Sequence, residues 1–344
     1  MVDHTAREIH HQPQAWAETL SYLEANSSQF LSFLAGEGEE VIFTGCGTSY
    51  NLSLSAAALW QTLAQTPARA VPASQVFLFP QTVFVPGRKY RLFAISRSGE
   101  TSETVQALNF FKKNNFGQGC ALTCEAGSSL SQTGDLVIVT ASAREESVVM
   151  TQSFSTMLLS LLYLAGRQAK KELKLSLLPE ILSQNMETYE PMVRELARNL
   201  SFQKFIFLGN GPYYGIAWEG SLKLKEMSLT PTETFHFLEF RHGPKSIVDD
   251  HTLIIALTSQ QAFSPEQAVL LEMMELGATI FHIGSSRLSP SSKLFEIALD
   301  GEGINDYTLP ILDVAFLQLL GYYRAQARGL NPDQPKNLTK VVKL

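Results

Sequence analysis

Short apolar runs alternate with longer stretches of helical periodicity along the first half of the chain. The apolar runs predict strands at 41–44, 90–95, 121–123 and 136–140. The stretches between and after them predict helices at 49–63, 101–113 and 152–165. Strands that alternate with helices are typical of βαβ units, in which neighbouring strands run parallel.

The second half repeats this alternation. Strands are predicted at 204–208, 253–257 and 279–283, and helices at 214–228, 265–276 and 310–328. The amphipathic stretch 173–197 predicts one or two helices that connect the halves. The polar stretch 331–344 predicts a tail rather than a core element.

The two halves also align with each other. Val41–Gly47 aligns with Phe205–Gly211 at an offset of 164 positions, and Leu92–Ser98 aligns with Ile254–Gln260 at an offset of 162. A nearly constant offset indicates an internal duplication. We therefore expect an α/β protein with two tandem domains, each a doubly wound, mostly parallel sheet flanked by helices. The expected limits are 1–175 and 176–330, followed by a C-terminal tail at 331–344.

Composition narrows the class of protein. The 344 residues are 45% hydrophobic and 17% charged, which suits two globular α/β domains. The net charge of -6, without a basic stripe, argues against a nucleic-acid partner. No apolar run reaches the ~18 residues that a membrane span needs. Because the bulk charge does not attract anions, a phosphate would have to be held by local geometry.

Cysteine usage and the first residues point to the cytoplasm. Cys46, Cys120 and Cys124 fit neither a zinc site nor a disulfide framework, so we expect no metal, no cofactor and a reducing compartment. Cys120 and Cys124 lie on an apolar stretch and are expected to be buried thiols. Cys46 is expected to be a small residue in a tight loop rather than a nucleophile. The polar start Met1–His4 predicts no signal peptide.

Two hydroxyl-rich loops follow predicted strands of the first half. Gly45-Cys46-Gly47-Thr48-Ser49 leads into a helix, where glycine permits a sharp turn and the helix N-terminus offers N–H groups to an anion. Ser96–Thr101, with the sequence Ser-Arg-Ser-Gly-Glu-Thr, repeats this arrangement. Each loop alone is also explained as a plain turn or an N-cap. Together, at strand ends of one sheet, they predict a phosphate site. The second-half copy, Gly209–Tyr213, is poorer in hydroxyls, so the first half should carry the phosphate.

The loop pair resembles that of the sugar isomerase (SIS) domain family, in which strand-Gly-x-Gly-Thr-Ser precedes Ser-x-Ser-Gly-Glu-Thr. Met150–Phe154 resembles the matching loop of the tagatose-6-phosphate ketose/aldose isomerase and amino-sugar-phosphate deaminase branch. The first resemblance implies that a sugar phosphate is held by Thr48, Ser49, Ser96, Ser98 and Thr101. Further substrate contacts are implied for Gly47, Arg97 and Ser153.

The segment 219–226 places ionisable side chains on one face of a predicted helix. Glu219, Lys223 and Glu226 stand at i, i+4 and i+7. A solvated ladder of salt bridges explains this spacing as well as a catalytic site does. Interconversion of an aldose and a ketose needs a carboxylate that carries a proton between C1 and C2. A partly buried glutamate beside a lysine suits that role.

Two further candidates lie toward the C-terminus. His242 stands between Arg241 and Gly243-Pro244, a rigid turn near the surface. A histidine that titrates near neutrality can move the ring proton of a cyclic sugar, and a purely structural histidine is the alternative. The tail around Lys340 is either a frayed terminus or a segment that folds over a pocket and delivers an amine.

Together these segments resemble the isomerase half of glucosamine-6-phosphate synthase. That family's Glu-Gly-x-Leu-Lys-Leu-Lys-Glu, a His-Gly-Pro 16 residues later and a final Gln-Pro-x-Asn-Leu-x-Lys all occur here. The resemblance implies Glu226 as the proton carrier and His242 as the ring-opening group. It implies Lys340 as the amine at the carbonyl carbon and Lys223 as a supporting proton relay. It also implies a homodimer with a shared active site, since in that family the histidine comes from the neighbouring subunit.

We therefore expect an enzyme that converts an amino-sugar or aldose 6-phosphate into a ketose 6-phosphate. Val2 stands where the synthase has the cysteine of its glutaminase, so we expect no glutaminase. Arg97 and the Phe240–Ser246 segment resemble the tagatose branch, whereas Glu239 and the Lys340 tail resemble the synthase. Deamination, plain isomerisation and synthesis from free ammonia stay open.

Two other functions compete with this interpretation. One is deglycation of fructosyl-amino acid 6-phosphates, which uses similar steps. The other is a non-catalytic sugar-phosphate sensor, because SIS domains also occur in regulators. A sensor needs the hydroxyl loops but no proton carrier, so Glu226, His242 and Lys340 favour the enzyme.

Overall fold

The computed structural model describes residues 3–35 and 40–342, which form two compact units. The first unit comprises 11–35, 40–146, 150–179 and 339–342. The second comprises 3–10, 147–149 and 180–338. The predicted domain limits, 1–175, 176–330 and 331–344, stay a prediction. Within these ranges, residues 1–2, 36–39 and 343–344 lie outside the described residues.

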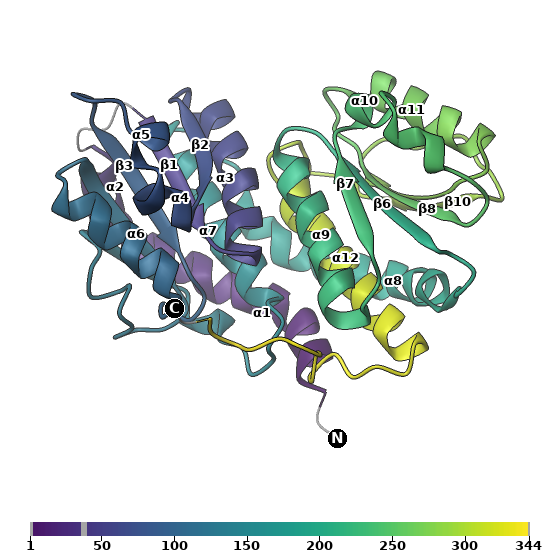
Figure 1. Cartoon of the computed structure of the whole chain (residues 1–344), viewed down its shortest axis with the longest axis horizontal. Coiled ribbons are helices and arrows are strands. Elements are labelled where there is room, and N and C mark those ends of the chain that lie inside the picture. The colour runs from purple at the N-terminus through teal and green to yellow at the C-terminus, as the bar shows by residue number, and fades with distance from the viewer. Residues whose placement is uncertain (1–2, 36–39, 343–344) are drawn as a thin grey trace. The chain divides into compact units, whose positions relative to one another are not determined.

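The first unit is built on a five-stranded parallel sheet with strand order β2-β1-β3-β4-β5 (Figure 1). Its strands are β1 (Glu40–Gly45), β2 (Ala68–Pro72), β3 (Tyr90–Ile95), β4 (Gly117–Thr123) and β5 (Leu136–Val139). Its helices are α2 (Ser27–Leu34), α3 (Thr48–Ala64), α4 (Ala73–Leu78), α5 (Pro80–Val83), α6 (Ser102–Lys113) and α7 (Gln152–Gln168). Helix α1 (His4–Ala25) starts in the second unit and continues into the first.

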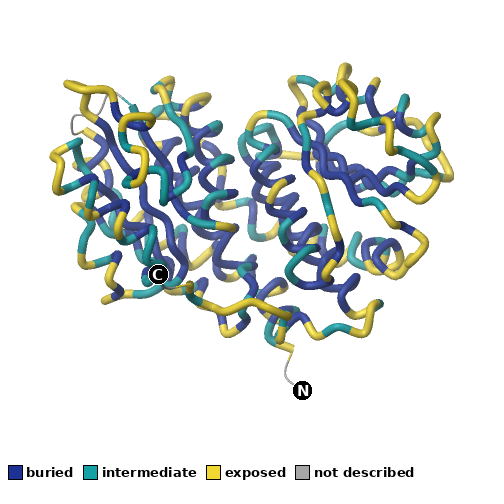
Figure 2. The backbone as a smooth tube through the Cα atoms, viewed as in Figure 1, coloured by how far each residue is buried: buried dark blue, intermediate teal, exposed yellow. Residues whose placement is uncertain are grey.

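Side chains of the central strands alternate between two helical layers. Phe43 of β1 and Phe93 of β3 stack at 5.1 Å, and both contact Trp60 of α3. Ile42 and neighbouring residues of the same strands pack with α4 and α6 on the other face. Burial on both faces explains the continuous apolar runs of β1 and β3, which Figure 2 shows as buried.

The second unit contains a parallel sheet with the order β10-β9-β8-β6-β7. Its strands are β6 (Lys204–Gly209), β7 (Thr232–Phe235), β8 (Thr252–Leu257), β9 (Thr279–Gly284) and β10 (Leu294–Ala298). Its helices are α8 (Leu178–Arg198), which begins at the end of the first unit, α9 (Pro212–Ser228), α10 (Phe237–Phe240), α11 (Phe263–Glu275) and α12 (Leu309–Ala327). Helices α9 and α12 pack together, and α10 and α11 share a core with the opposite face.

The two sheets have the same topology in chain order. In each, the first strand lies between the second and the third, and the fourth and fifth follow outward. Gly47 before α3 has φ 54° and ψ -124°, and Gly211 before α9 has φ 52° and ψ -126°. The α/β class and the parallel sheets predicted from the sequence are thereby confirmed, and the repeated sequence pattern corresponds to a repeated topology.

Several elements were not predicted from the sequence. Strands β2, β7 and β10 are edge strands, and they are only partly buried. The predicted strand 121–123 begins earlier, at Gly117, where a Cβ would lie 1.8 Å from the carbonyl oxygen of Tyr90. Helix α1 contains Pro13 and many His and Gln residues, yet tertiary contacts bury Trp16 completely. These elements could not be predicted from local composition, because tertiary packing rather than intrinsic propensity stabilises them.

The C-terminal tail is anchored within the second unit. The carboxylate of Asp333 accepts the N–H groups of His4 and Thr5 at 2.9 and 2.8 Å and the Thr5 hydroxyl at 2.6 Å, so it caps α1. Burial raises the pKa of Asp333, but these hydrogen bonds outweigh it and hold the pKa below its ordinary value. The tail is thus held in place here rather than frayed.

Within the described ranges, no helix combines the length and apolarity needed to cross a bilayer.

Candidate functional site

The loop after β1 turns sharply into α3. A Cβ at Gly45 would lie 2.6 Å from the Cβ of Ser49 and 3.0 Å from the carbonyl oxygen of Ile95, so only glycine fits. Gly47 has a positive φ and faces open space. Thr48 and Ser49 form the first turn of α3 and are largely buried. Their hydroxyls stand at the positive end of a helix dipole, as a phosphate cradle requires.

The loop after β3 forms a second compact turn. The Oγ atom of Ser96 accepts the N–H of Gly99 at 3.1 Å and lies 3.2 Å from the hydroxyl of Thr101. The Oγ atom of Ser98 accepts the N–H of Glu100 at 3.2 Å. Gly99 has φ 64°, and a Cβ there would lie 2.0 Å from Ser128 Oγ. The turn therefore fixes Ser98 and Thr101, both half-buried, near the start of α6.

The sheet brings the two loops together. Strands β1 and β3 pair in parallel from Glu40 with Tyr90 to Thr44 with Ala94, so both loops leave the same edge of the sheet. Because β2 lies on one side of β1 and β3 on the other, this edge is the switch point at which open α/β sheets bind ligands. The sequence predicted this neighbourhood, and the register confirms it.

The thiols match their predicted structural roles. Cys120 and Cys124 are fully buried. Burial raises the pKa of Cys124 to about 12, and it also raises the pKa of Cys46, whose sulfur lies 3.8 Å from the Thr104 hydroxyl. A raised pKa keeps the Cys46 thiol protonated at neutral pH, which suits a small loop residue better than a nucleophile.

In the second unit, an internal carboxylate occupies the corresponding loop. Asp306 accepts the N–H groups of Gln260 and Gln261 at 2.7 and 3.0 Å, and the hydroxyl of Tyr213 at 2.8 Å. Gln260 and Gln261 follow β8 as Ser98 and Gly99 follow β3. The N–H groups that could bind an anion after β8 are thus already paired with an acid of the same chain.

The ionisable residues on α9 form a buried series of charges. Lys223 Nζ lies 3.1 Å from Glu219 Oε1 and 2.6 Å from Glu226 Oε2. The side chains of Lys223 and Glu219 are fully buried, whereas Glu226 is 19% exposed. Burial lowers the pKa of Lys223, but the two carboxylates outweigh it, and the net shift is upward. A solvated ladder of salt bridges is therefore excluded, and Glu226 is the member that solvent or a ligand reaches.

His242 lies on an exposed turn after α10. Its backbone N–H donates to the carbonyl oxygen of Glu239 at 3.0 Å, and Gly243 continues the turn with φ 116°. The flanking Arg241 and Lys245 both pair with Glu272 of α11. The surface turn predicted for His242 is confirmed, and its neighbours hold it against α11.

The remaining predicted residues meet in the first unit at Glu145, which the sequence patterns did not single out. Arg97 Nη1 donates to the Glu145 carboxylate at 2.9 Å, and Ser153 Oγ donates to it at 2.7 Å. Lys340 Nζ donates to the carbonyl oxygen of Glu145. The side chain of Arg97 is nearly buried and that of Ser153 is fully buried. Both donate hydrogen bonds to the Glu145 carboxylate inside the unit. In the sequence, Glu145 is marked only as one of two adjacent glutamates that precede the predicted helix 152–165.

The predicted residues thus fall into two groups, each within one unit. The first unit holds the hydroxyl loops with Arg97, Ser153 and Lys340. The second holds Glu226, Lys223 and His242.

Comparison with known proteins identifies the family. The model of the SIS domain matches residues 34–167. A solved structure of glucosamine-6-phosphate deaminase from Thermotoga maritima is 30% identical, covers 99% of both chains and has a TM-score of 0.84. The chain belongs to the SIS domain family. The matched range of this SIS chain runs from the end of α2 to α7 and contains both hydroxyl loops.

Other relatives of this SIS chain are isomerising enzymes. Glutamine–fructose-6-phosphate aminotransferase (isomerizing) of Buchnera aphidicola is 31% identical over an alignment of 340 positions, which covers 94% of this chain and 54% of the relative. The chain spans about half the length of the curated relatives it matches. Tagatose-6-phosphate ketose/aldose isomerase of Escherichia coli is 23% identical, with 96% and 94% of the chains covered and a TM-score of 0.87, and shares the fold.

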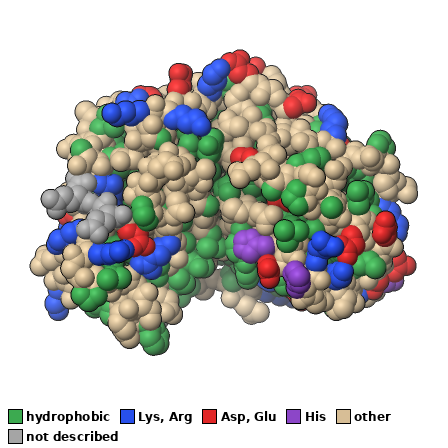
Figure 3. Space-filling model, turned by 90° about the horizontal axis from the view of Figure 1, so that it is seen from above, with side chains coloured by type: hydrophobic (Ala, Val, Ile, Leu, Met, Phe, Trp, Pro, Cys, Tyr) green, Lys and Arg blue, Asp and Glu red, His purple; other side chains and the backbone are tan. Residues whose placement is uncertain are grey.

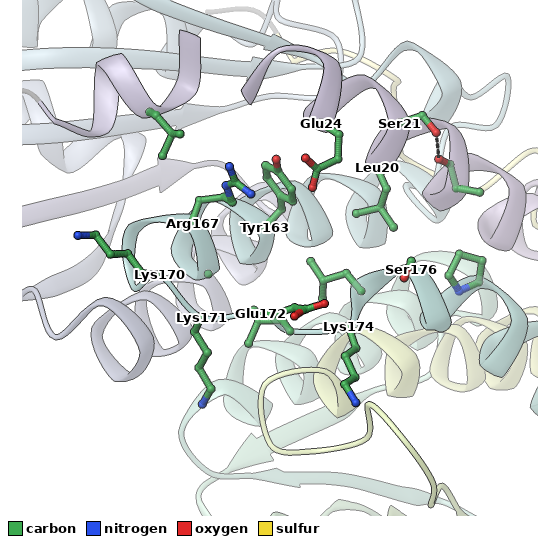
Figure 4. A pocket seen from close by; sticks show the side chains of 16 residues that line it. Leu20, Ser21, Glu24, Tyr163, Arg167, Lys170, Lys171, Glu172, Lys174 and Ser176 are labelled. Atoms are coloured by element: carbon green, nitrogen blue, oxygen red, sulfur yellow. Dashed lines mark hydrogen bonds between the residues drawn. The ribbon is translucent and has the colours of Figure 1, made fainter. Parts of the chain in front are cut away.

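A separate cavity of about 970 Å³ lies in the first unit of the SIS chain, between α1, α7 and the segment 170–176 (Figure 4). None of the predicted site residues lines it. The guanidinium of Arg167 lies over the Tyr163 ring and donates to Ser27, whereas Lys171 and Lys174 point elsewhere. These cations do not converge on a common point in the cavity. Among the described residues, no cluster of His, Cys, Asp and Glu could hold a metal ion.

The buried acids of the second unit predict a pH-dependent stability of the SIS chain. Burial raises the pKa of Glu266 to about 7, despite hydrogen bonds from Ser259 and Asn210. Between pH ~4.5 and ~7 the folded state then binds more protons than the unfolded state, so the free energy of unfolding falls as pH rises. The loss from this group is on the order of 2–3 kcal/mol.

Urea denaturation at about pH 5 and pH 7.5 checks this expectation. Glu266→Gln should flatten the decline in the free energy of unfolding. Glu275→Gln, at the exposed end of the same helix α11, should leave the decline unchanged. Equal declines in all three proteins would contradict the assignment.

Proposed function

We propose that this chain is a sugar-phosphate isomerase and deaminase that converts an amino-sugar 6-phosphate into a ketose 6-phosphate. In the open-chain 2-amino aldehyde, a base removes the proton from C2 and returns it to C1. The resulting C2 imine takes up water and releases ammonia, so the sum is hexosamine 6-phosphate plus water to ketose 6-phosphate plus ammonia. Carbon 1 is reduced and carbon 2 is oxidised, and no external redox partner is needed.

The first unit is proposed to hold the phosphate. Thr48, Ser49, Ser96, Ser98 and Thr101 supply hydroxyls at the β1/β3 switch point, and Gly47 leaves the approach open. On the face shown in Figure 3, basic and acidic side chains are interspersed, so local donors rather than a charged surface must hold the anion. The second unit is an unsuitable phosphate site because Asp306 already fills the corresponding loop. We also propose that this second sheet is a second SIS domain, on the strength of the shared strand order.

The buried charge series on α9 carries the proposal for the chemistry. Removing two or more charges from water is costly, and burial of Lys223 between Glu219 and Glu226 is most easily explained by function. Glu226, with its partial exposure, is the proposed proton carrier between C2 and C1. The raised pKa of Lys223 favours a fixed cation that supports Glu226 over a relay that gives up its own proton.

The other predicted residues are assigned by the same logic. His242 is proposed as the ring-opening group, since its exposed turn leaves the imidazole accessible. Lys340 is proposed as the amine at the carbonyl carbon. A homodimer in which His242 completes the site of the neighbouring subunit is proposed from the motif resemblance to the isomerase half of glucosamine-6-phosphate synthase. Arg97 and Ser153 are proposed to act through Glu145 rather than by direct contact.

Deamination is proposed ahead of plain isomerisation. A solved relative that covers 99% of this chain at 30% identity is named a glucosamine-6-phosphate deaminase. The isomerase likeness, to tagatose-6-phosphate ketose/aldose isomerase, is weaker in sequence.

An assay over a panel of sugar phosphates tests the proposal. We expect ammonia and ketose 6-phosphate in equal amounts from at least one hexosamine 6-phosphate, and none from the unphosphorylated amino sugars. Interconversion of aldose and ketose 6-phosphates without ammonia would replace deamination by isomerisation. Release of an amino acid from a fructosyl-amino acid 6-phosphate would indicate a deglycase. Binding of sugar phosphates without any turnover would leave a sensor.

A further inference from the structure

The carboxylate of Glu145 is fully buried and densely hydrogen-bonded in the first unit. It follows the short 3-10 turn Ala141–Ala143 and precedes α7. Its oxygens accept the N–H groups of Thr151 and Ser153 at 2.7 and 3.0 Å and both hydroxyls of these residues at 3.1 and 2.7 Å. Arg97 adds a charged donor at 2.9 Å. A carboxylate in this position neutralises the N-terminus of α7 as a bound anion would.

Three separate segments meet at this residue. Arg97 belongs to the loop after β3, and Thr151 and Ser153 belong to the start of α7. Lys340 comes from the C-terminal tail: its ammonium donates to the Glu145 carbonyl oxygen, and its own carbonyl oxygen accepts Arg97 Nη2 at 3.3 Å. Glu145 therefore holds Lys340 at its ammonium, and Arg97 holds it at its backbone carbonyl oxygen. All of these residues belong to one compact unit.

The charges of this cluster are unequal. Glu145 contributes one negative charge, whereas Arg97 and Lys340 contribute two positive charges. Arg97 and Glu145 are 8% and 0% exposed and form a buried ion pair. Lys340 is held through a neutral carbonyl oxygen, so its ammonium is positioned without being paired with the carboxylate. The cluster adjoins Ser96 and Ser98, where the phosphate is proposed to bind.

We propose that Glu145 is a positioning residue that fixes Lys340 beside the Ser96–Thr101 loop and keeps Arg97 from taking a phosphate directly. This rests on the function proposed above. It predicts that Glu145 acts on the chemical step through Lys340, while phosphate binding depends on the hydroxyls. Small displacements of a reacting group cost about 100-fold in rate, which sets the expected size of the effect.

Glu145→Gln tests the proposal, because an amide keeps the shape but removes the charge and cannot accept all five hydrogen bonds. We expect kcat to fall about 100-fold while KM and the affinity for inorganic phosphate change less than about tenfold. Amide hydrogen exchange of residues 339–342 should become faster. Glu125→Gln, which removes the exposed pair with Arg144 in the same unit, should leave all four quantities unchanged.

A merely structural role predicts a different pattern. The melting temperature, kcat and phosphate affinity would then fall together, in proportion to the folded fraction, and the proposal would be overturned. Unchanged kcat and unchanged exchange at 339–342 would also overturn it. If Glu145→Gln does not fold, the double variant Arg97→Gln/Glu145→Gln leaves no unpaired buried charge and should show the same loss of kcat. Wild-type kcat in that folded variant would refute positioning.

The exchange measurement separates this proposal from the proposed function. If the wild-type chain turns over no sugar phosphate, the function fails. Faster exchange at 339–342 in Glu145→Gln, with normal exchange in Glu125→Gln, would still support the role of Glu145 in holding the tail. Identical exchange at 339–342 in both variants would rule out the role of Glu145 in holding the tail.

Discussion

Glu226→Gln is expected to reduce the turnover of the sugar-phosphate substrate by about 100- to 10,000-fold. The amide is nearly isosteric with the carboxylate but cannot take a proton from C2. The phosphate-binding hydroxyls of the first unit are untouched, so the affinity for the substrate should change little. Steady-state kinetics and calorimetric binding with the substrate found in the panel assay provide the measurement.

The control for this variant is Glu187→Gln, which changes an exposed carboxylate on α8 in the same unit. It should keep wild-type kinetics. Normal turnover by Glu226→Gln would end the assignment of the proton carrier. Mixed dimers of Glu226→Gln and His242→Ala subunits should regain some activity if sites are shared, because one site then receives both intact residues. No recovery would argue against a shared site.

Lys223→Met is expected to lower the free energy of unfolding by about 3–5 kcal/mol. Lys223 is fully buried between Glu219 and Glu226, and its removal takes away the cation that both carboxylates contact. Glu219 is itself fully buried and cannot recover hydration. Turnover should fall as well, because Glu226 loses the cation that holds it in place. Chemical denaturation at neutral pH gives the change in stability.

Lys225→Met is the matched control, two residues further along α9. The side chain of Lys225 is half-buried and donates to Ser221 rather than to a carboxylate, so the expected loss is about 1 kcal/mol. The double variant Lys223→Met/Glu219→Gln removes one surplus charge and should recover part of the stability without recovering turnover. A Lys223→Met protein as stable as wild type would show that the cluster is hydrated and would contradict its buried description.

The sequence was sufficient to predict the central strands and the position of the hydroxyl loops. Strands β1, β3, β6 and β8 are buried on both faces, so their apolar runs are continuous and easily read. Gly45 and Gly99 are required by close contacts, and such local requirements leave a direct trace in the sequence. The edge strand β2 left no such trace, because an edge is solvated and its composition is mixed.

The charged residues show where the sequence stopped being informative. Spacing placed Glu219, Lys223 and Glu226 on one helix face, yet burial by the rest of the second unit decided that they form a desolvated cluster. Likewise, the family resemblance implied substrate contacts for Arg97 and Ser153 and an amine role for Lys340, but it did not indicate that folding brings all three to Glu145. Periodicity and glycine requirements act between near neighbours in the chain and are written in the sequence. Desolvation and the pairing of distant charges depend on which segments meet, and only the tertiary structure decides that.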